Sequence, residues 1–307
     1  MSLLRFVRTL LLVFVTLPGA IRASDIKVEL VQVQTDDGIT LNGALWSPAS
    51  SRARVGIALA TGTGGEFYDN SWFGERYARA GYLVLSLNRR DHGANFGYYK
   101  LEPSALDHRY AVDLLMSRGV ESVVLAGHSY GTVTVPYYVM VSDDSEVKGV
   151  ILTSALGDLR VGTRIATGGQ EKYDEIVSRA REMVKAGRGK ESFLMSPLTA
   201  GGRSLVHDYE TFLDKRGPDS KAVPYESLKK VKDRPILAIR DPADPLPATL
   251  PPAQQQLEES NPNLQYVLLP DIYNGKMVRA SHGFVGRQEE VFGIIQTWLH
   301  QHDLTPQ

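Results

Sequence analysis

The sequence predicts an α/β fold with a mainly parallel sheet, and three observations lead to this prediction. Strand-like and helix-like periodicity alternate along most of the chain. The strand-like runs at 55–61 (VGIALAT) and 122–127 (SVVLAG) are almost continuously apolar, which is typical of strands covered on both faces. Glycine-rich turns follow both runs, at 61–65 (TGTGG) and 127–131 (GHSYG).

The first two elements are expected to form a hairpin. The segment 27–35 (KVELVQVQT) alternates apolar and polar residues, and the turn DDG separates it from 40–48 (TLNGALWSP). Buried strands and periodic helices then alternate, and Gly119 is expected to end one of these helices. The strands are expected at 55–61, 82–88, 122–127, 147–155, 234–241 and 264–271, and the helices at 71–81, 103–119, directly after 129, and about 286–300.

The alternation stops between residues 155 and 233, where we expect no strand. Helical spacing continues in 170–187 and 207–217, and the stretch is rich in Gly, Arg and Lys. We therefore predict one domain over residues 24–307, with a helical cap inserted at about 156–232. The sequence makes no prediction of oligomeric state.

The N-terminal residues 1–23 are predicted to be a secretory signal peptide. Arg5 and Arg8 precede an apolar run, and small residues follow it in the segment IRAS. We expect cleavage after Ala23, with Ala20 as the second choice, and export to the periplasm or the medium. The alternative is an uncleaved membrane anchor, but the apolar run is short for spanning a bilayer.

The composition excludes several functional classes. The chain of 307 residues is 43% hydrophobic and 22% charged, as soluble globular proteins are. Its net charge is −1 and it contains no run of Lys or Arg, so neither nucleic acid nor an anionic membrane is an expected partner. It contains no cysteine, which excludes a thiol nucleophile, Cys-ligated zinc and iron–sulfur chemistry.

The motif GHSYG makes Ser129 the candidate nucleophile. It matches G-x-S-x-G between a predicted strand and a predicted helix, where the serine of a nucleophile elbow occupies a sharp, strained turn. Gly127 and Gly131 would avoid collisions between side chains and the adjacent backbone. The start of the helix would also offer N–H groups to a developing oxyanion. The alternative is a strand-to-helix turn without chemistry.

Elimination among the seven histidines indicates His282 as the base that a serine nucleophile needs. In folds with this elbow, the acid and then the histidine follow the serine along the chain. His282 lies between the last strand and the last helix, beside Gly283. The rejected histidines are His92 and His108 before the serine, His128 beside it and expected to point away, His207 in the insertion, and His300 and His302 near the C-terminus.

The acid that orients the histidine is predicted to be Asp244. It follows the strand at 234–241 in the segment RDPADPLP, so its carboxylate would lie at the carboxyl edge of the sheet, where such sites occur. Asp241 in the same segment and Asp158 after the preceding strand are the alternatives, and Asp271 is a more distant one. An ordinary turn is the competing explanation for either Asp-Pro pair.

Two backbone N–H groups are expected to form an oxyanion hole. One belongs to Tyr130, directly after the candidate nucleophile, and the other to Thr63 in the loop TGTGG, with Gly64 as the next choice. This loop lacks the Lys-Ser ending of a P-loop and is too short for a dinucleotide fingerprint, so we reject a nucleotide site.

Together these motifs resemble the α/β-hydrolase superfamily over nearly the whole mature length. TGTGG corresponds to the family's oxyanion loop, GHSYG to its elbow, RDPADPLP to its acid turn and SHGF to its histidine, and the insertion lies where the family inserts its cap. RRDHGANFG also looks like the family's structural Arg-Gly-His-Gly-x-Ser turn.

Three departures from the family pattern stand out. Thr61 replaces a histidine, Asn95 stands where a serine is common, and the segment 271–282 is longer than usual.

The resemblance implies a serine hydrolase, and we expect it to act on carboxylic esters through an acyl-enzyme. Its partner would be a small-molecule ester or acyl substrate, with no metal and no organic cofactor. The alternatives are a peptidase or amidase with the same residues, or a binding protein that kept the fold without catalysis. Several arginines of the insertion could favour a polar or anionic acyl substrate, but arginines on helices are more often solvated: Arg160, Arg164, Arg179, Arg181 and Arg203.

Overall fold

The computed structural model describes residues 26–49, 52–195, 205–242, 244, 246, 251–273, 276–277 and 281–306. The predicted signal peptide at 1–23, both predicted cleavage sites and Arg203 lie outside these residues. In the described part of the chain, no helix combines the length and the apolar character that crossing a membrane requires.

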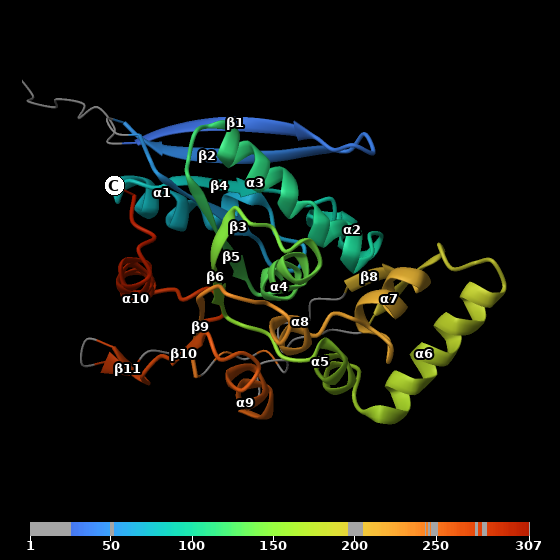
Figure 1. Cartoon of the computed structure of the whole chain (residues 1–307). Helices are drawn as coiled ribbons and strands as arrows, with labels where there is room; N and C mark the ends of the chain where they lie inside the picture. Colours follow the sequence, from blue (N-terminus) through green and yellow to red (C-terminus); the bar gives the residue numbers. More distant parts are fainter. Residues whose placement is uncertain are drawn as a thin grey trace, which may run out of the picture.

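An eight-stranded sheet forms the centre of the molecule, in the order β1-β2-β4-β3-β5-β6-β9-β10 (Figure 1). β1 pairs antiparallel with β2 and β2 antiparallel with β4, whereas every later neighbour pairs in parallel. The predicted α/β fold with a mainly parallel sheet is therefore confirmed. The strands are β1 (Ile26–Gln34), β2 (Thr40–Pro48), β3 (Val55–Ala60), β4 (Leu83–Leu87), β5 (Ser122–His128), β6 (Val147–Thr153), β9 (Ile236–Arg240) and β10 (Leu264–Leu268).

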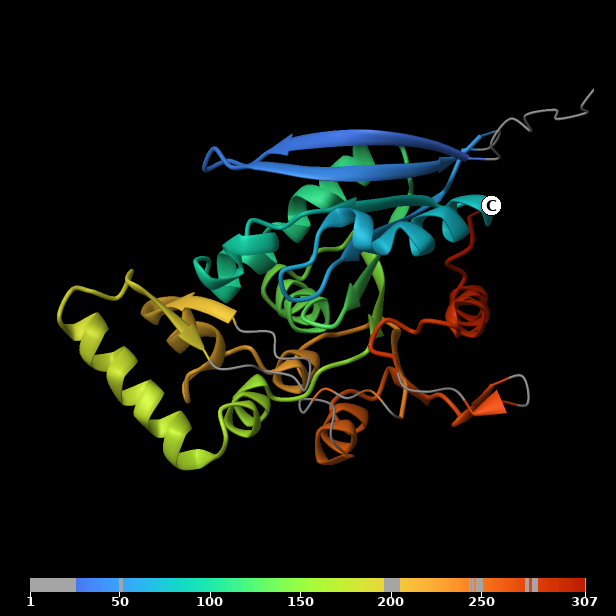
Figure 2. The same ribbon diagram turned by 180° about the vertical axis from the view of Figure 1, so that it is seen from behind.

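Helices cover both faces of the sheet, as the two opposite views show (Figures 1 and 2). On one face, α1 and α10 bury Tyr77 and Trp298 against strand residues such as Ile57. The other face packs against α2, α3, α4, α8 and α9. These helices are α1 (Ser71–Arg79), α2 (Leu101–Leu106), α3 (His108–Ser117), α4 (Gly131–Ser142), α8 (Pro224–Leu228), α9 (Pro251–Glu258) and α10 (Gln288–Gln301).

The helix expected at 103–119 is divided into α2 and α3 at Asp107. The Asp107 carboxylate accepts a hydrogen bond from the backbone N–H of Arg90 at 2.7 Å and pairs with the Arg90 guanidinium at 2.8 Å. Asp107 is 2% exposed, so these contacts fix its position between the two helices. Sequence periodicity does not reveal such a long-range contact.

The segment between β6 and β9 contains two strands that the sequence analysis excluded. β7 (Ser192–Met195) and β8 (Leu205–Asp208) pair antiparallel, beside α5 (Leu159–Ala166), α6 (Gln170–Lys185) and α7 (Tyr209–Arg216). The expectation of no strand here was wrong, because four-residue strands are too short to produce a recognisable alternation. The segment has its own small apolar cluster, formed by Tyr173, Val177, Ala180, Met195, Tyr209 and Phe212.

A buried ion pair fastens this inserted segment to the central domain. Lys215 of α7 lies with its Nζ 2.8 Å from Oδ2 of Asp91, and both side chains are fully buried. The same Nζ donates to the carbonyl oxygen of Phe96 at 2.9 Å, and Arg89 contacts Asp91 from the other side at 3.1 Å. Burial alone would raise the pKa of Asp91, but the two cations outweigh it and lower the pKa to about 2. The turn RRDHG therefore anchors α7.

Candidate active site

Ser129 occupies a strained turn between β5 and α4. Its φ of 54° lies in the left-handed region, which residues other than glycine seldom adopt. The residue is 7% exposed, and its backbone N–H donates to the carbonyl oxygen of Thr153 at 3.0 Å. Such strain in a buried residue is typical of functional sites.

The two glycines of GHSYG permit this turn for steric reasons. A Cβ atom on Gly127 would lie 2.4 Å from the carbonyl oxygen of Gly131, and one on Gly131 would lie 2.5 Å from that of Ala60. Both separations are far shorter than a van der Waals contact. The ends of β3 and β5 and the start of α4 can approach one another this closely only because neither position has a side chain.

The structure brings Asp244 and His282 together. Nδ1 of His282 lies 2.7 Å from Oδ2 of Asp244, and the Asp244 side chain is completely buried. Oδ1 of the same carboxylate accepts the N–H of Leu246 at 3.0 Å, which fixes its orientation. Since a carboxylate only accepts, we assign the proton of a neutral His282 to Nδ1, and its Nε2 then carries a lone pair.

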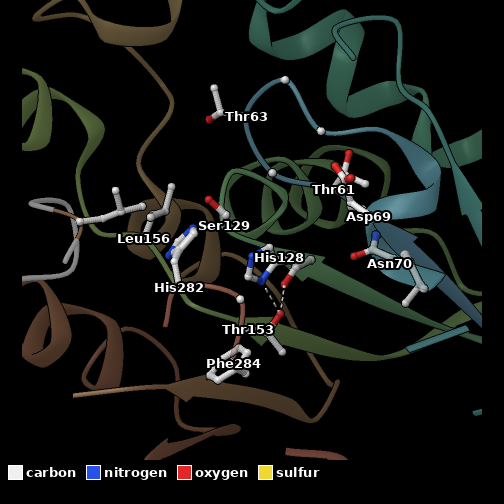
Figure 3. A pocket seen from close by; sticks show the side chains of 18 of the residues that line it. Thr61, Thr63, Asp69, Asn70, His128, Ser129, Thr153, Leu156, His282 and Phe284 are labelled. Carbon is white, nitrogen blue, oxygen red and sulfur yellow. Dashed lines mark hydrogen bonds between the residues drawn. The ribbon is translucent and has the colours of Figure 1, made fainter. Parts of the chain in front are cut away.

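Nε2 of His282 is buried and has no hydrogen-bond partner among the described residues. In Figure 3 the ring of His282 is turned toward the hydroxyl group of Ser129. Both side chains line the same cavity. The arrangement leaves the free imidazole nitrogen available to take a proton from a hydroxyl group in this cavity.

Ser154 positions the histidine loop, and the sequence analysis did not identify it. Its hydroxyl group donates to the carbonyl oxygen of His282 at 2.6 Å, and its N–H donates to that of Ile239 at 2.9 Å. Its φ is 51°, so it turns the chain sharply directly after β6. The one feature of the sequence that could have indicated this role is the position of Ser154 directly after the end of β6, the strand that pairs with β5.

His128 is a second residue to which the sequence assigned no role. It was expected to point away from the side chain of Ser129. It lines the cavity, and its ring centroid lies 5.0 Å from that of His282. Its Nδ1 lies 3.2 Å from the hydroxyl oxygen of Thr153, which itself donates to the carbonyl of Gly127. The surrounding protein and the neighbouring His282 lower the pKa of His128 to about 3, so its ring stays neutral at ordinary pH.

The alternative acids have other partners. Asp241 pairs with the buried guanidinium of Arg287 at 3.3 Å. Asp158 caps the N-terminus of α5 and pairs with Arg160 at 2.6 Å. Among Asp158, Asp241 and Asp244, the structure thus places only Asp244 against the histidine.

The loop TGTGG passes directly over Ser129. A Cβ atom on Gly62 would lie 3.0 Å from Cβ of Ser129, so the two residues are in contact. Thr63 follows and lines the cavity, while the carbonyl oxygen of Thr61 accepts a hydrogen bond from Arg89 at 3.2 Å. The Tyr130 side chain is fully buried against Phe96, away from the cavity lining. The side chain of Tyr130 therefore cannot contribute to an oxyanion hole, and the candidate donor at this residue is its backbone N–H.

The cavity above Ser129 has a volume of about 590 Å³ and a largely apolar wall. Figure 3 shows how several of its lining residues lie around Ser129. Trp72, Phe73 and Phe284 come from the central domain, and the inserted segment contributes further lining residues: Leu156, Leu159, Gly162, Leu205 and Arg216. A cavity of this size accommodates a small organic molecule. Within the described ranges, no three His, Asp or Glu side chains are grouped so as to hold a metal ion.

Comparison with known proteins gives a consistent result for the fold. A family model described as "Protein of unknown function (DUF1749)" matches residues 76–202. No curated protein matches the sequence.

Solved structures match over most of the chain. A carboxyl esterase from Bacillus coagulans is 13% identical with a TM-score of 0.68, covering 89% of this chain and 98% of its own. A monoglyceride lipase from Saccharomyces cerevisiae, solved with a substrate analogue, is 14% identical with a TM-score of 0.63, covering 89% and 94%. An acylaminoacyl peptidase from Pyrococcus horikoshii is 12% identical with a TM-score of 0.59, covering 91% of this chain and 42% of its own. At these identities the likeness shows that the chain shares their fold.

Gly131→Ala should destabilise the protein, because the new methyl group would collide with the backbone of β3. We expect a loss of about 1–3 kcal/mol in the free energy of unfolding, measured by urea denaturation. Gly293→Ala is the control: it lies within α10, where a Cβ atom meets nothing within 4 Å. That substitution should stabilise by roughly 0.5–1 kcal/mol. Equal effects of the two would contradict the steric account.

Asp244→Asn should lower kcat by roughly 10³- to 10⁴-fold, because the amide no longer holds His282 in the required tautomer. Asp241→Asn and Asp158→Asn are controls and should lower kcat by less than about tenfold. Steady-state kinetics on one ester, with unfolding curves for each variant, would make the comparison. A larger loss for Asp158→Asn or Asp241→Asn would show that the acid is assigned to the wrong residue.

Proposed function

Since the chain is an α/β-hydrolase by fold, as its sequence motifs predicted, we propose that it is a serine hydrolase of carboxylic esters. One observation carries the proposal: His282 is bound to Asp244 through Nδ1, and its ring, whose Nε2 has no partner among the described residues, is turned toward Ser129 (Figure 3). This arrangement supplies a nucleophile, a base and an orienting carboxylate in one place.

In the proposed reaction, Oγ of Ser129 attacks the ester carbonyl while Nε2 of His282 takes the hydroxyl proton. Asp244 stabilises the imidazolium that forms. The backbone N–H groups of Thr63 and Tyr130 stabilise the negative oxygen of the tetrahedral intermediate. His282 then returns its proton to the departing alcohol, and an acyl-enzyme remains on Ser129. Water activated by His282 releases the acid and restores the serine.

Strain at Ser129 supports this assignment. The left-handed backbone costs about 1–3 kcal/mol, which a fold retains when the position has a use. The inserted segment supports it as well, because its side chains complete the cavity wall above Ser129. We propose that this segment, predicted at 156–232, acts as the cap that selects the substrate.

A peptidase or amidase is the second candidate, because the structural neighbours include an acylaminoacyl peptidase. The same residues can attack an amide carbonyl, and the shape of the cavity decides which bond is presented. Export by the predicted signal peptide is a separate proposal, which the N-terminal residue of the mature protein would test.

A panel of p-nitrophenyl esters and aminoacyl amides tests the function. We expect turnover of short esters at rates well above those of the amides, and loss of turnover in Ser129→Ala, which lacks the nucleophile. Release of p-nitrophenol and of the amine would be measured on the mature protein. Turnover of amides without turnover of esters would contradict the proposed esterase activity and support the peptidase or amidase instead. No turnover by folded protein, and no reaction of Ser129 with a fluorophosphonate, would indicate a binding protein.

A further inference from the structure

Arg216 is a buried cation in the wall of the catalytic cavity. It is the last residue of α7, lines the cavity beside Leu159 and Gly162, and is 5% exposed. Its guanidinium group makes two hydrogen bonds with described residues. Nε donates to Nε2 of His207 at 3.4 Å, and Nη1 donates to the hydroxyl oxygen of Thr163 at 3.2 Å.

Neither partner of Arg216 is an anion. Burial and the nearby cations Arg216 and Lys215 hold the pKa of His207 well below its usual value, so the ring accepts from Arg216 as a neutral group. Thr163 is uncharged. The third guanidinium nitrogen, Nη2, makes no hydrogen bond with a described residue, and no carboxylate of the described chain forms an ion pair with Arg216.

The four described arginines that the sequence suggested for anion binding differ from Arg216. Arg160 and Arg181 form ion pairs with Asp158 and Asp219. Arg164 and Arg179 donate to a glutamine and a tyrosine, and neither is buried. None of these four lines the cavity. No sequence pattern distinguished Arg216 from these four.

Two further buried cations, Lys215 and Arg89, lie near Arg216. Lys215 and Arg89 share the single carboxylate of Asp91. Burial lowers the pKa of Arg216 to about 10, which still leaves the group protonated at neutral pH. Burial also raises the pKa of Tyr130 well above its usual value, so this phenol is neutral and cannot serve as a counterion.

A buried charge without a counterion is costly, and proteins usually pair it or use it for binding. We propose that Arg216 binds a carboxylate group of the substrate, so that the enzyme prefers esters that carry a second, anionic end. The proposal rests on the proposed ester hydrolysis. A guanidinium group with a free nitrogen suits the two oxygens of a carboxylate, and one uncompensated charge suits a monoanion better than a dianionic phosphate. The wall formed by Trp72, Phe73 and Phe284 would hold the apolar remainder.

Two matched pairs of esters test the proposal. The first compares the p-nitrophenyl monoester of glutaric acid with its terminal amide, which places the charge on the acyl side. The second compares 4-acetoxybenzoate with 4-acetoxybenzamide, which places it on the alcohol side. We expect the charged member of one pair to have a kcat/KM about 10- to 100-fold higher, the range of a charge-assisted hydrogen bond, mostly through a lower KM.

Variants connect this preference to the side chain. Arg216→Gln should abolish the preference for the charged ester, and Arg216→Lys should restore part of it. Arg181→Gln, an exposed arginine elsewhere in the inserted segment, is the control and should keep the full preference. Equal or faster turnover of the neutral member in both pairs would overturn the proposal. So would a preference that persists in Arg216→Gln.

A measurement on the unaltered protein covers the case in which Arg216→Gln does not fold. Glutaramate and benzoate, both monoanions, should slow the reaction of Ser129 with an uncharged fluorophosphonate at concentrations where glutaramide and benzamide do not. Equal protection by acids and amides would overturn the anionic preference even though Ser129 reacts. Failure of Ser129 to react at all would instead refute the proposed hydrolase, so the two failures are distinguishable.

Discussion

The site depends on one steric constraint, the contact between the backbones of β3, β5 and α4 at Gly127 and Gly131. Side chains at these positions would lie 2.4–2.5 Å from carbonyl oxygens, so the three segments can meet only through glycine. Their approach forces the turn at Ser129 into the left-handed region. It also directs the start of α4, with its positive dipole end, toward the same cavity.

The other residues of the site lie at the ends of neighbouring strands, around the turn at Ser129. The end of β6 holds Ser129 through the carbonyl of Thr153 and holds the histidine loop through the hydroxyl of Ser154. The loop after β9 provides Asp244. The inserted segment is fastened by the buried pair of Lys215 and Asp91, which fixes the end of α7 and hence places Arg216 in the cavity wall. A structural ion pair thus also determines what the cavity presents to a substrate.

Local patterns predicted the fold and the main candidates because each has a short-range signature. Buried strands appear in the sequence as apolar runs, and the nucleophile elbow appears as a serine with a glycine two residues away on either side. Chain order indicated His282, and it left Asp241 and Asp158 as alternatives to Asp244. The sequence did not predict the positions of Ser154, His128 and Arg216, because these depend on contacts between residues distant in the chain. It did not predict β7 and β8 because these strands are too short to show a periodic pattern. The sequence alone does not distinguish a buried arginine from an exposed one, because burial depends on the surrounding tertiary structure.

We propose that the strained serine of the elbow is the nucleophile and that His282 and Asp244 activate it. Mass-spectrometric mapping of a fluorophosphonate adduct tests this claim most directly, because the reagent reacts with an activated serine. We expect one adduct, on Ser129, formed quickly by the folded protein, slowly by Asp244→Asn and not after unfolding. An adduct on another residue, or the same rate of reaction in Asp244→Asn, would contradict it.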